Sequence, residues 1–188
     1  MNDSTNDEIT HNNILDFWFS ESTKRLWFNS IPEFDQSIRL KYQPLWEQAS
    51  EGLLESWRDT SLGALSLVIV LDQFPLNMFR GTAKSFSTEA QAIIVSRTAL
   101  TQSFDKQLSS IQLPFLYMPL MHSENLDDQN YSVTLFEQAE LESNIRFAKH
   151  HRDIIEKYGR FPHRNNILNR TSTDAELEYL ASPQAFKG

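Results

Sequence analysis

The sequence contains no cysteine among its 188 residues. This absence excludes disulfide frameworks, thiol catalysis, iron–sulfur clusters and thiolate zinc sites. Glycine (5) and proline (7) are also scarce, which argues against a low-complexity chain or several flexible linkers. We therefore expect one domain, which at this length buries roughly 70% of its unfolded surface without a metal or disulfide.

Positive charge is also in short supply, with 17 Lys and Arg against 25 Asp and Glu and a formal charge of -8. This balance argues against a broad nucleic-acid-binding surface. The longest uncharged apolar run, between Asp59 and Asp72, is shorter than the ~18 residues of a membrane-spanning helix. The start, MNDSTNDEIT, does not resemble a signal peptide. We expect a soluble, cytoplasmic protein that binds neither membrane nor nucleic acid.

The apolar residues recur mainly at helical spacing. They predict a helix that begins after Thr10 and a second over residues 32–50, with Pro32 in its first turn. Pro44 should bend or split this second helix.

The run over residues 61–78 is apolar nearly all round. Its LSLVIVL segment resembles a buried strand, but the chain has no second strand-like run to pair with it. We therefore predict a buried central helix, perturbed in its last turns by Pro75.

In the rest of the chain, residues typical of helix starts and ends predict the helix boundaries. Thr88 with Gln91, and Thr173 with Glu176, have the spacing of a capping box at a helix start. The segment IQLPFLYMPL is predicted as a helix that Pro114 interrupts and that closes near Pro119. Residues 126–158 should form two helices, with Gly159 as the stop.

These elements predict an all-α fold of antiparallel helix pairs. The expected organisation is a flexible N-terminus over residues 1–9, one helical domain over residues 10–182, and a C-terminal tail over residues 183–188.

Several short motifs lack the partners that their chemistry needs. His122-Ser123-Glu124 matches the H-x-E of zinc deaminases, but their P-C-x-x-C pair is absent. His151-Arg152-Asp153 spells the kinase H-R-D without a glycine-rich loop or D-F-G. No phosphate-binding loop, dinucleotide fingerprint, nucleophile elbow or H-E-x-x-H is present either. We expect no cofactor and no metal site.

One polar group follows the buried run directly and contains Asp72, Gln73, Asn77 and Arg80. An Asp that follows a dozen uncharged residues is costly to bury unless it is paired, and Arg80 is a candidate partner. A structural ion pair and a functional site are both open interpretations.

A second polar group contains His122 and Glu124, which we expect in a loop after Pro119. A histidine with a carboxylate can transfer protons or bind a metal. Ser123 or Asn125 would cap the helix that begins near Leu126.

His151 shares a helical stripe with Phe147, Ile154 and Ile155, which predicts that it points inward. Such a histidine is more often a hydrogen-bonded core residue than a ligand.

A basic segment lies near the C-terminus. Residues 146–170 contain seven Lys and Arg and two Asp and Glu, a local balance of +5. Arg160, His163 and Arg164 lie there, together with Pro162, which is predicted to open a short helical turn. The segment either pairs with acidic residues of the chain or offers a positive site to an anion.

Five strings carry a resemblance to a known family: DFWF, LDQFPLNMFRGTA, FLYMPLMHSE, HRDIIEKYGRFPHRN and ST-x-x-E. The chain resembles, from about Ile14 to Leu180, a bacterial family known as domain of unknown function 924. The resemblance implies a helical fold similar to tetratricopeptide-repeat superhelices and no established activity. The sequence departs from the family pattern at Leu76, where arginine is usual, and at Asn169, where glycine is frequent.

The family's recurrent polar positions fall on Asp72, Gln73, Asn77, Arg80, His122, Ser123, Glu124, His151, Arg152, Asp153, Arg160, His163, Arg164, Asn165 and Arg170. From these we predict ligand-binding residues Asp72, Gln73, Asn77, Arg80, His122, Glu124, His151, Arg152, Arg160, His163 and Arg164.

Three functional hypotheses follow. The first, which the sequence favours, is a binding module whose guanidinium groups, from Arg80, Arg160, Arg164 and Arg170, hold an anionic small molecule or an acidic peptide. The second is a small-molecule hydrolase or lyase, with His122 or His163 as general base and Glu124 or Asp72 as acid or orienting group. In the third, the polar residues only satisfy one another within a helical bundle. The oligomeric state is left open.

Overall fold

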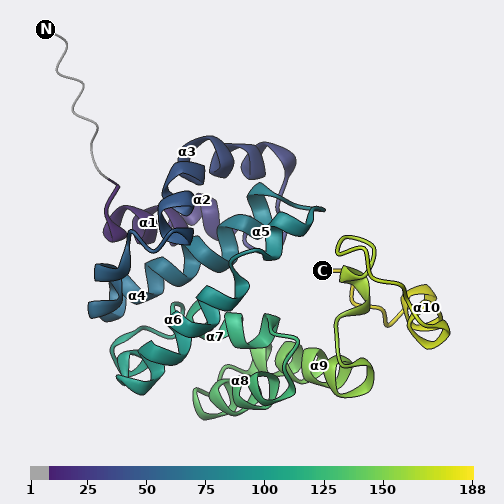
Figure 1. The fold of residues 1–188 in the computed structure, drawn as a ribbon. Helices are drawn as coiled ribbons and strands as arrows, with labels where there is room; N and C mark the ends of the chain where they lie inside the picture. Colours follow the sequence, from purple (N-terminus) through teal and green to yellow (C-terminus); the bar gives the residue numbers. More distant parts are fainter. Residues whose placement is uncertain (1–8) are drawn as a thin grey trace, which may run out of the picture.

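The computed structural model describes residues 9–188, and all regular secondary structure in that range is helical (Figure 1). The all-α prediction is confirmed. The predicted flexible N-terminus lies outside the described residues except for Ile9. The principal helices are α1 (His11–Trp18), α2 (Glu21–Lys24), α3 (Pro32–Ser50), α4 (Ser61–Val68), α5 (Phe74–Met78), α6 (Glu89–Thr101), α7 (Leu113–His122), α8 (Leu126–Gln138), α9 (Glu142–Tyr158) and α10 (Asp174–Ala181). Short 3₁₀ or π segments are η1 (Glu55–Asp59), η2 (Ile69–Gln73), η3 (Ala83–Phe86), η4 (Phe104–Gln107) and η5 (Pro162–Arg164).

Helices pack in pairs that are close, but not always consecutive, along the chain. α1 packs on α4, α3 on α5, α6 on α7, and α8 on α9. Further contacts of α4 with α6 and of α7 with α8 join these pairs, so α6 and α7 lie between the two ends of the molecule (Figure 1). One large apolar core runs through α1 to α9, and a smaller one lies around Ile154, Ile155 and Phe161.

Local cap chemistry sets many helix ends where the sequence predicts them. The Thr10 hydroxyl accepts a hydrogen bond from the Asn13 amide, in a capping box that opens α1. Pro32 stands in the first turn of α3. Gly159 ends α9 in the left-handed conformation (φ 69°). The predicted capping box at Thr173 opens α10.

The central segment is helical throughout Ser61–Met78, as predicted, but it contains a π-turn at η2. The Phe74 amide donates to the carbonyl of Ile69, five residues back. Pro75 has no N–H for the carbonyl of Leu71, which instead accepts the Thr88 hydroxyl at 2.6 Å. Pro75 therefore perturbs the helix one turn before itself, and this π-turn carries Asp72 and Gln73. π-Turns of this kind are frequent at functional sites.

By length and apolar character, Ser61–Met78 could also cross a membrane, although its uncharged part is short. In the structure, 89% of this segment is buried inside the protein. The segment forms the centre of the core.

Four predictions about helix breaks and caps are wrong. Pro114 does not interrupt its helix but stands in the first turn of α7. Pro44 does not split α3, which is continuous from Pro32 to Ser50. α7 does not close at Pro119 but continues to His122, because packing of its buried apolar residues holds it together. Thr88 and Gln91 form no capping box, because the Thr88 hydroxyl contacts Leu71 instead.

Candidate functional site

Asp72 and His122 are 50 residues apart in the sequence and form a hydrogen-bonded pair in the core of the molecule. His122 Nδ1 lies 2.9 Å from Asp72 Oδ1. The Asp72 side chain is 3% exposed and the His122 side chain 17%. Because a carboxylate only accepts hydrogen bonds, this contact places the proton of the neutral imidazole on Nδ1.

The other imidazole nitrogen, Nε2, has no hydrogen-bond partner among the described residues and is not closed off from solvent. With the proton on Nδ1, Nε2 carries the free lone pair. This arrangement can accept a proton from a bound molecule.

The π-turn and the end of α7 create this pair. Asp72 lies on η2, and His122 is the last residue of α7, so the predicted loop position of His122 is wrong. Gln73 donates from Nε2 to Asp72 Oδ2 and also contacts the sulfur of Met118. Asp72 is thus held at both oxygens, which fixes the direction of the imidazole.

Arg164 joins this pair to a further carboxylate. Its Nη1 donates to Glu89 Oε2 at 2.8 Å, and its Nη2 donates to the backbone carbonyl of His122 at 2.9 Å. The guanidinium lies over the rings of Phe86 and Phe161, at 4.4 and 4.7 Å from their centroids. With 7% of its side chain exposed, Arg164 is a fixed part of the structure.

Glu89, the first residue of α6, is the site residue that sequence reasoning missed. Burial raises the pKa of Glu89, the charges of Arg164 and His122 lower it, and the charge of Asp72 raises it again, with a net increase. In the sequence Glu89 looks like an ordinary acidic residue in a first helical turn. Nothing local indicates a partner 75 residues away.

Glu124 belongs to the same region but serves a structural role. Its Oε1 accepts from the backbone amide of Phe161 at 2.8 Å, and Arg170 Nη1 donates to its Oε2 at 2.6 Å. Burial raises the pKa of Glu124, but the hydrogen bonds from Arg170 and Phe161 outweigh it and hold the pKa below its usual range. Glu124 thereby anchors the 160–170 segment to the end of α7.

His151 and His163 lie beside this segment. His151 is 4% exposed and points inward as predicted, with Nδ1 2.8 Å from the Phe147 carbonyl, although the Phe147 side chain is exposed. The rings of His151 and His163 contact Phe186, with centroids 4.4 and 5.0 Å apart. The pKa of His151 is lowered to about 3 and that of His163 to about 4, mainly by burial, and the charge of His122 contributes to both decreases.

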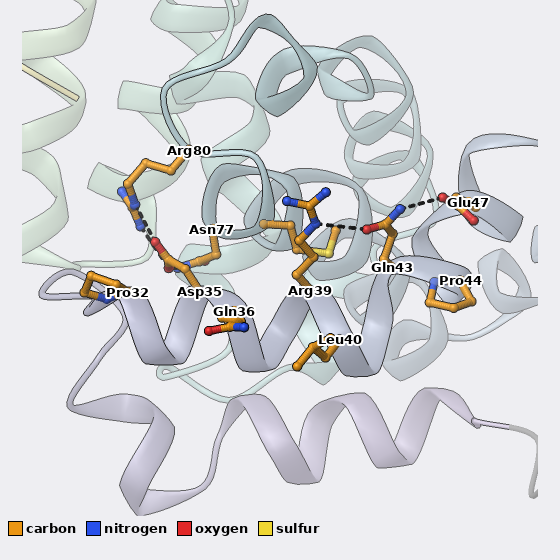
Figure 2. Close-up of a pocket in the computed structure, with 11 residues that line it drawn as sticks. Pro32, Asp35, Gln36, Arg39, Leu40, Gln43, Pro44, Glu47, Asn77 and Arg80 are labelled. Carbon is orange, nitrogen blue, oxygen red and sulfur yellow. Dashed lines mark hydrogen bonds and ion pairs between the residues drawn. The ribbon is translucent and has the colours of Figure 1, made fainter.

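Asn77 and Arg80 lie apart from the pair, in a groove of about 820 Å³ along α3 (Figure 2). There Arg80 Nε contacts Asp35 Oδ2 at 2.7 Å, and Asn77 Nδ2 contacts Asp35 Oδ1 at 2.7 Å. Arg80 therefore pairs with Asp35 and not with Asp72. Neither Asp72 nor His122 lines this groove.

Arg152 and Arg160 also lie in other surroundings. Arg152 pairs with Asp153 at 2.8 Å, and Arg160 pairs with Glu176 at 2.6 Å. Hydrogen bonding to Arg160 is the main reason that the pKa of Glu176 falls to about 2. The structure thus brings Asp72, Gln73, His122 and Arg164 into direct contact, while Arg80, Arg152 and Arg160 pair elsewhere.

The sequence left the cap of α8 open between Ser123 and Asn125. Asn125, rather than Ser123, caps α8 by accepting from the amides of Asp127 and Asp128. Ser123 donates its hydroxyl to the Asp128 carboxylate. Within residues 9–188, no three His, Asp or Glu side chains are grouped so that they could hold a metal ion.

Comparisons with known proteins agree with this fold. The family model described as bacterial protein of unknown function (DUF924) matches residues 14–184. The solved structure of a protein of unknown function from Agrobacterium tumefaciens is 32% identical, with a TM-score of 0.84. The alignment covers 91% of this chain and 96% of that chain. A search of curated proteins finds no match.

Proposed function

This chain belongs to the DUF924 family of bacterial proteins of unknown function, and we propose that it is a small-molecule hydrolase or lyase. His122 is the general base, and Asp72 is its orienting group. The observation that carries this proposal is the 2.9 Å contact between Asp72 Oδ1 and His122 Nδ1, which leaves Nε2 without a protein partner among the described residues.

The surroundings of the pair support an acid–base role. A carboxylate on one imidazole nitrogen fixes the tautomer and stabilises the imidazolium that forms after proton uptake. Asp72 is buried and its second oxygen is bonded to Gln73, so the carboxylate cannot turn away. The proton taken up at Nε2 would come from a water molecule in a hydrolase or from the substrate in a lyase.

The geometry gives less support to an anion-binding module. Each of the four guanidinium groups considered for that role already contacts a carboxylate: Arg80 with Asp35, Arg160 with Glu176, Arg164 with Glu89 and Arg170 with Glu124. An incoming anion would have to displace these internal partners.

A metabolite extract of bacterial cells, incubated with the purified protein and followed by mass spectrometry, tests the proposal. We expect the wild type to consume at least one metabolite, and His122→Asn to slow this turnover by about a hundredfold or more. His150→Asn serves as the matched control, because His150 lies outside the pair, and it should retain turnover.

Two results would overturn the proposal. One is a wild-type protein that changes no metabolite in the extract. The other is a folded His122→Asn variant whose turnover equals that of the wild type, which would give the pair a structural role only.

A further inference from the structure

Glu89 occupies a defined position relative to the proposed base, although it comes from a different helix. One planar guanidinium donates to Glu89 Oε2 at 2.8 Å and to the His122 carbonyl at 2.9 Å. The two nitrogens of such a group are rigidly linked, so the carboxyl of Glu89 and the end of α7 are held beside each other. Because Phe86 and Phe161 enclose Arg164, this bridge has little freedom to move.

One oxygen of the Glu89 carboxyl has no protein partner in the described part of the chain. Arg164 occupies Oε2, whereas Oε1 has no hydrogen-bond partner among residues 9–188. The side chain retains 21% exposure, so a bound molecule can reach it. Burial raises the pKa of Glu89. The charge of His122 lowers this pKa and the charge of Asp72 raises it, so the three groups lie close enough to interact electrostatically.

From this geometry we infer that Glu89 is the second proton-transfer group of the site and donates a proton to the leaving atom while His122 accepts one from the attacking water. This inference rests on the proposed function and assigns it to hydrolysis. Two titratable groups in contrasting environments commonly divide the acid and base roles in this way.

The proposed step is balanced. The water oxygen forms a bond to the electrophilic atom of the substrate as one of its protons passes to His122 Nε2. The bond to the leaving oxygen or nitrogen breaks with its electron pair, and that atom takes the proton of Glu89. Return of a proton from the imidazolium to the Glu89 carboxylate through solvent restores the site, so one water is added across the bond.

The inference also indicates a class of substrate. A built-in proton donor matters most when the departing alkoxide or amine is strongly basic. We therefore expect unactivated esters or amides of small molecules, whose leaving groups need protonation.

Glu89→Gln is the direct test, because glutamine keeps an oxygen for Arg164 but cannot donate an acidic proton. Turnover of the same bacterial metabolite extract is measured across pH by mass spectrometry. We expect a loss of about a hundredfold. We also expect that the decline of wild-type turnover at high pH, where Glu89 loses its proton, disappears in the variant.

Two further variants control the test. Glu142→Gln is the matched control, because Glu142 is the exposed first residue of α9, as Glu89 is the first residue of α6, and its turnover should equal that of the wild type. Glu89→Asp keeps a carboxyl group and should recover part of the activity even if glutamine disturbs the fold.

The outcomes separate the two proposals. If Glu89→Gln keeps the turnover of the wild type and His122→Asn loses it, only the role of Glu89 is overturned. No turnover by the wild type would overturn both. Loss in Glu89→Gln with unchanged high-pH behaviour and no recovery in Glu89→Asp would make Glu89 a structural partner of Arg164, which also contradicts the inference.

Discussion

Gly63 shows how one residue shapes the entry to the central helix. A Cβ atom at this position would lie 2.2 Å from the backbone oxygen of Trp57 and 2.8 Å from the Thr60 hydroxyl. The same Thr60 hydroxyl caps α4 by accepting from the Gly63 amide at 3.1 Å. The absence of a side chain therefore allows η1 to pack against the first turn of α4.

We predict that Gly63→Ala lowers the free energy of unfolding by about 3 kcal/mol, because backbone atoms must move to admit the methyl group. Gly81→Ala is the control, because Gly81 has φ +76° but open space around its Cβ position. Strain at positive φ alone should cost about 1 kcal/mol. Urea unfolding of both variants checks this, and equal losses would contradict the steric account.

Asn169 adopts a backbone conformation that explains why glycine is frequent at this position in the family pattern. The family pattern often has glycine there, and asparagine tolerates the left-handed conformation that glycine would adopt. In the structure Asn169 has φ 54°, within that region.

At the scale of helices, the π-turn at η2 is stabilised by a contact from another element. The Thr88 hydroxyl donates to the Leu71 carbonyl at 2.6 Å and accepts from Trp46 Nε1 at 3.1 Å. It thereby satisfies the carbonyl that Pro75 leaves without an intrahelical donor. All of these atoms are buried, so water cannot replace the hydroxyl.

Thr88→Val keeps the shape of the side chain but leaves the Leu71 carbonyl unsatisfied. We predict a loss of about 2 kcal/mol in the free energy of unfolding, within the range for a buried polar group without a partner. Thr88→Ser retains the hydroxyl and should lose less. Denaturant unfolding distinguishes the two variants, and a valine variant as stable as the wild type would rule out this role for Thr88.

Helix ends were predictable where the cap lies within a few residues of the helix, as at Thr10, Gly159 and Thr173. At Thr88 the predicted helix start is correct, but the capping box does not form, because the Thr88 hydroxyl contacts Leu71 and Trp46, which are distant in sequence. Pro119 failed as a stop because burial of α7 outweighs the missing amide.

The sequence allowed us to predict several residues of the candidate site, but not which of them contact one another. Asp72 and His122 stand out because they directly follow apolar runs, which makes their burial and pairing plausible. That Asp72 contacts His122 and not Arg80 depends on how η2 and α7 pack. Glu89 could not be identified, because only the fold brings Arg164 to it.

In the whole molecule, many charged side chains neutralise one another in ion pairs, which the net charge alone does not show. The basic segment over residues 146–170 pairs with carboxylates from several elements, including Glu89, Glu124 and Glu176. Only Glu124 among these three lies between Lys106 and Arg146, a stretch without Lys or Arg that precedes the segment. Arg164 and Arg170 thereby tie the segment to α6 and to the end of α7, and Arg160 ties it to α10.

Buried neutral histidines make stability dependent on pH. The folded-state pKa values of His151 and His163 are lowered from 6.5 to about 3 and about 4. Below pH 6.5 the unfolded chain binds protons that the folded chain does not, so stability is lost as the pH falls. Each histidine should contribute about 1.4 kcal/mol per pH unit in this window.

Replacing His151 by leucine should therefore make the unfolding free energy less steep between about pH 6.5 and 5, where carboxylates contribute little. Chemical unfolding at a series of pH values measures this slope, with His150→Asn as the control. Identical slopes for the wild type and His151→Leu would contradict the assignment of His151 as a buried neutral group.

The central claim is that Asp72 holds His122 with a free lone pair on Nε2. Diethyl pyrocarbonate modifies unprotonated imidazole nitrogens, and peptide mass spectrometry measures the rate at His122 separately. Asp72→Asn allows an amide N–H to face Nδ1, which moves the imidazole proton to Nε2. We predict rapid modification of His122 in the wild type and a rate lower by on the order of tenfold or more in Asp72→Asn. Equal rates at His122 in the two proteins would contradict the account.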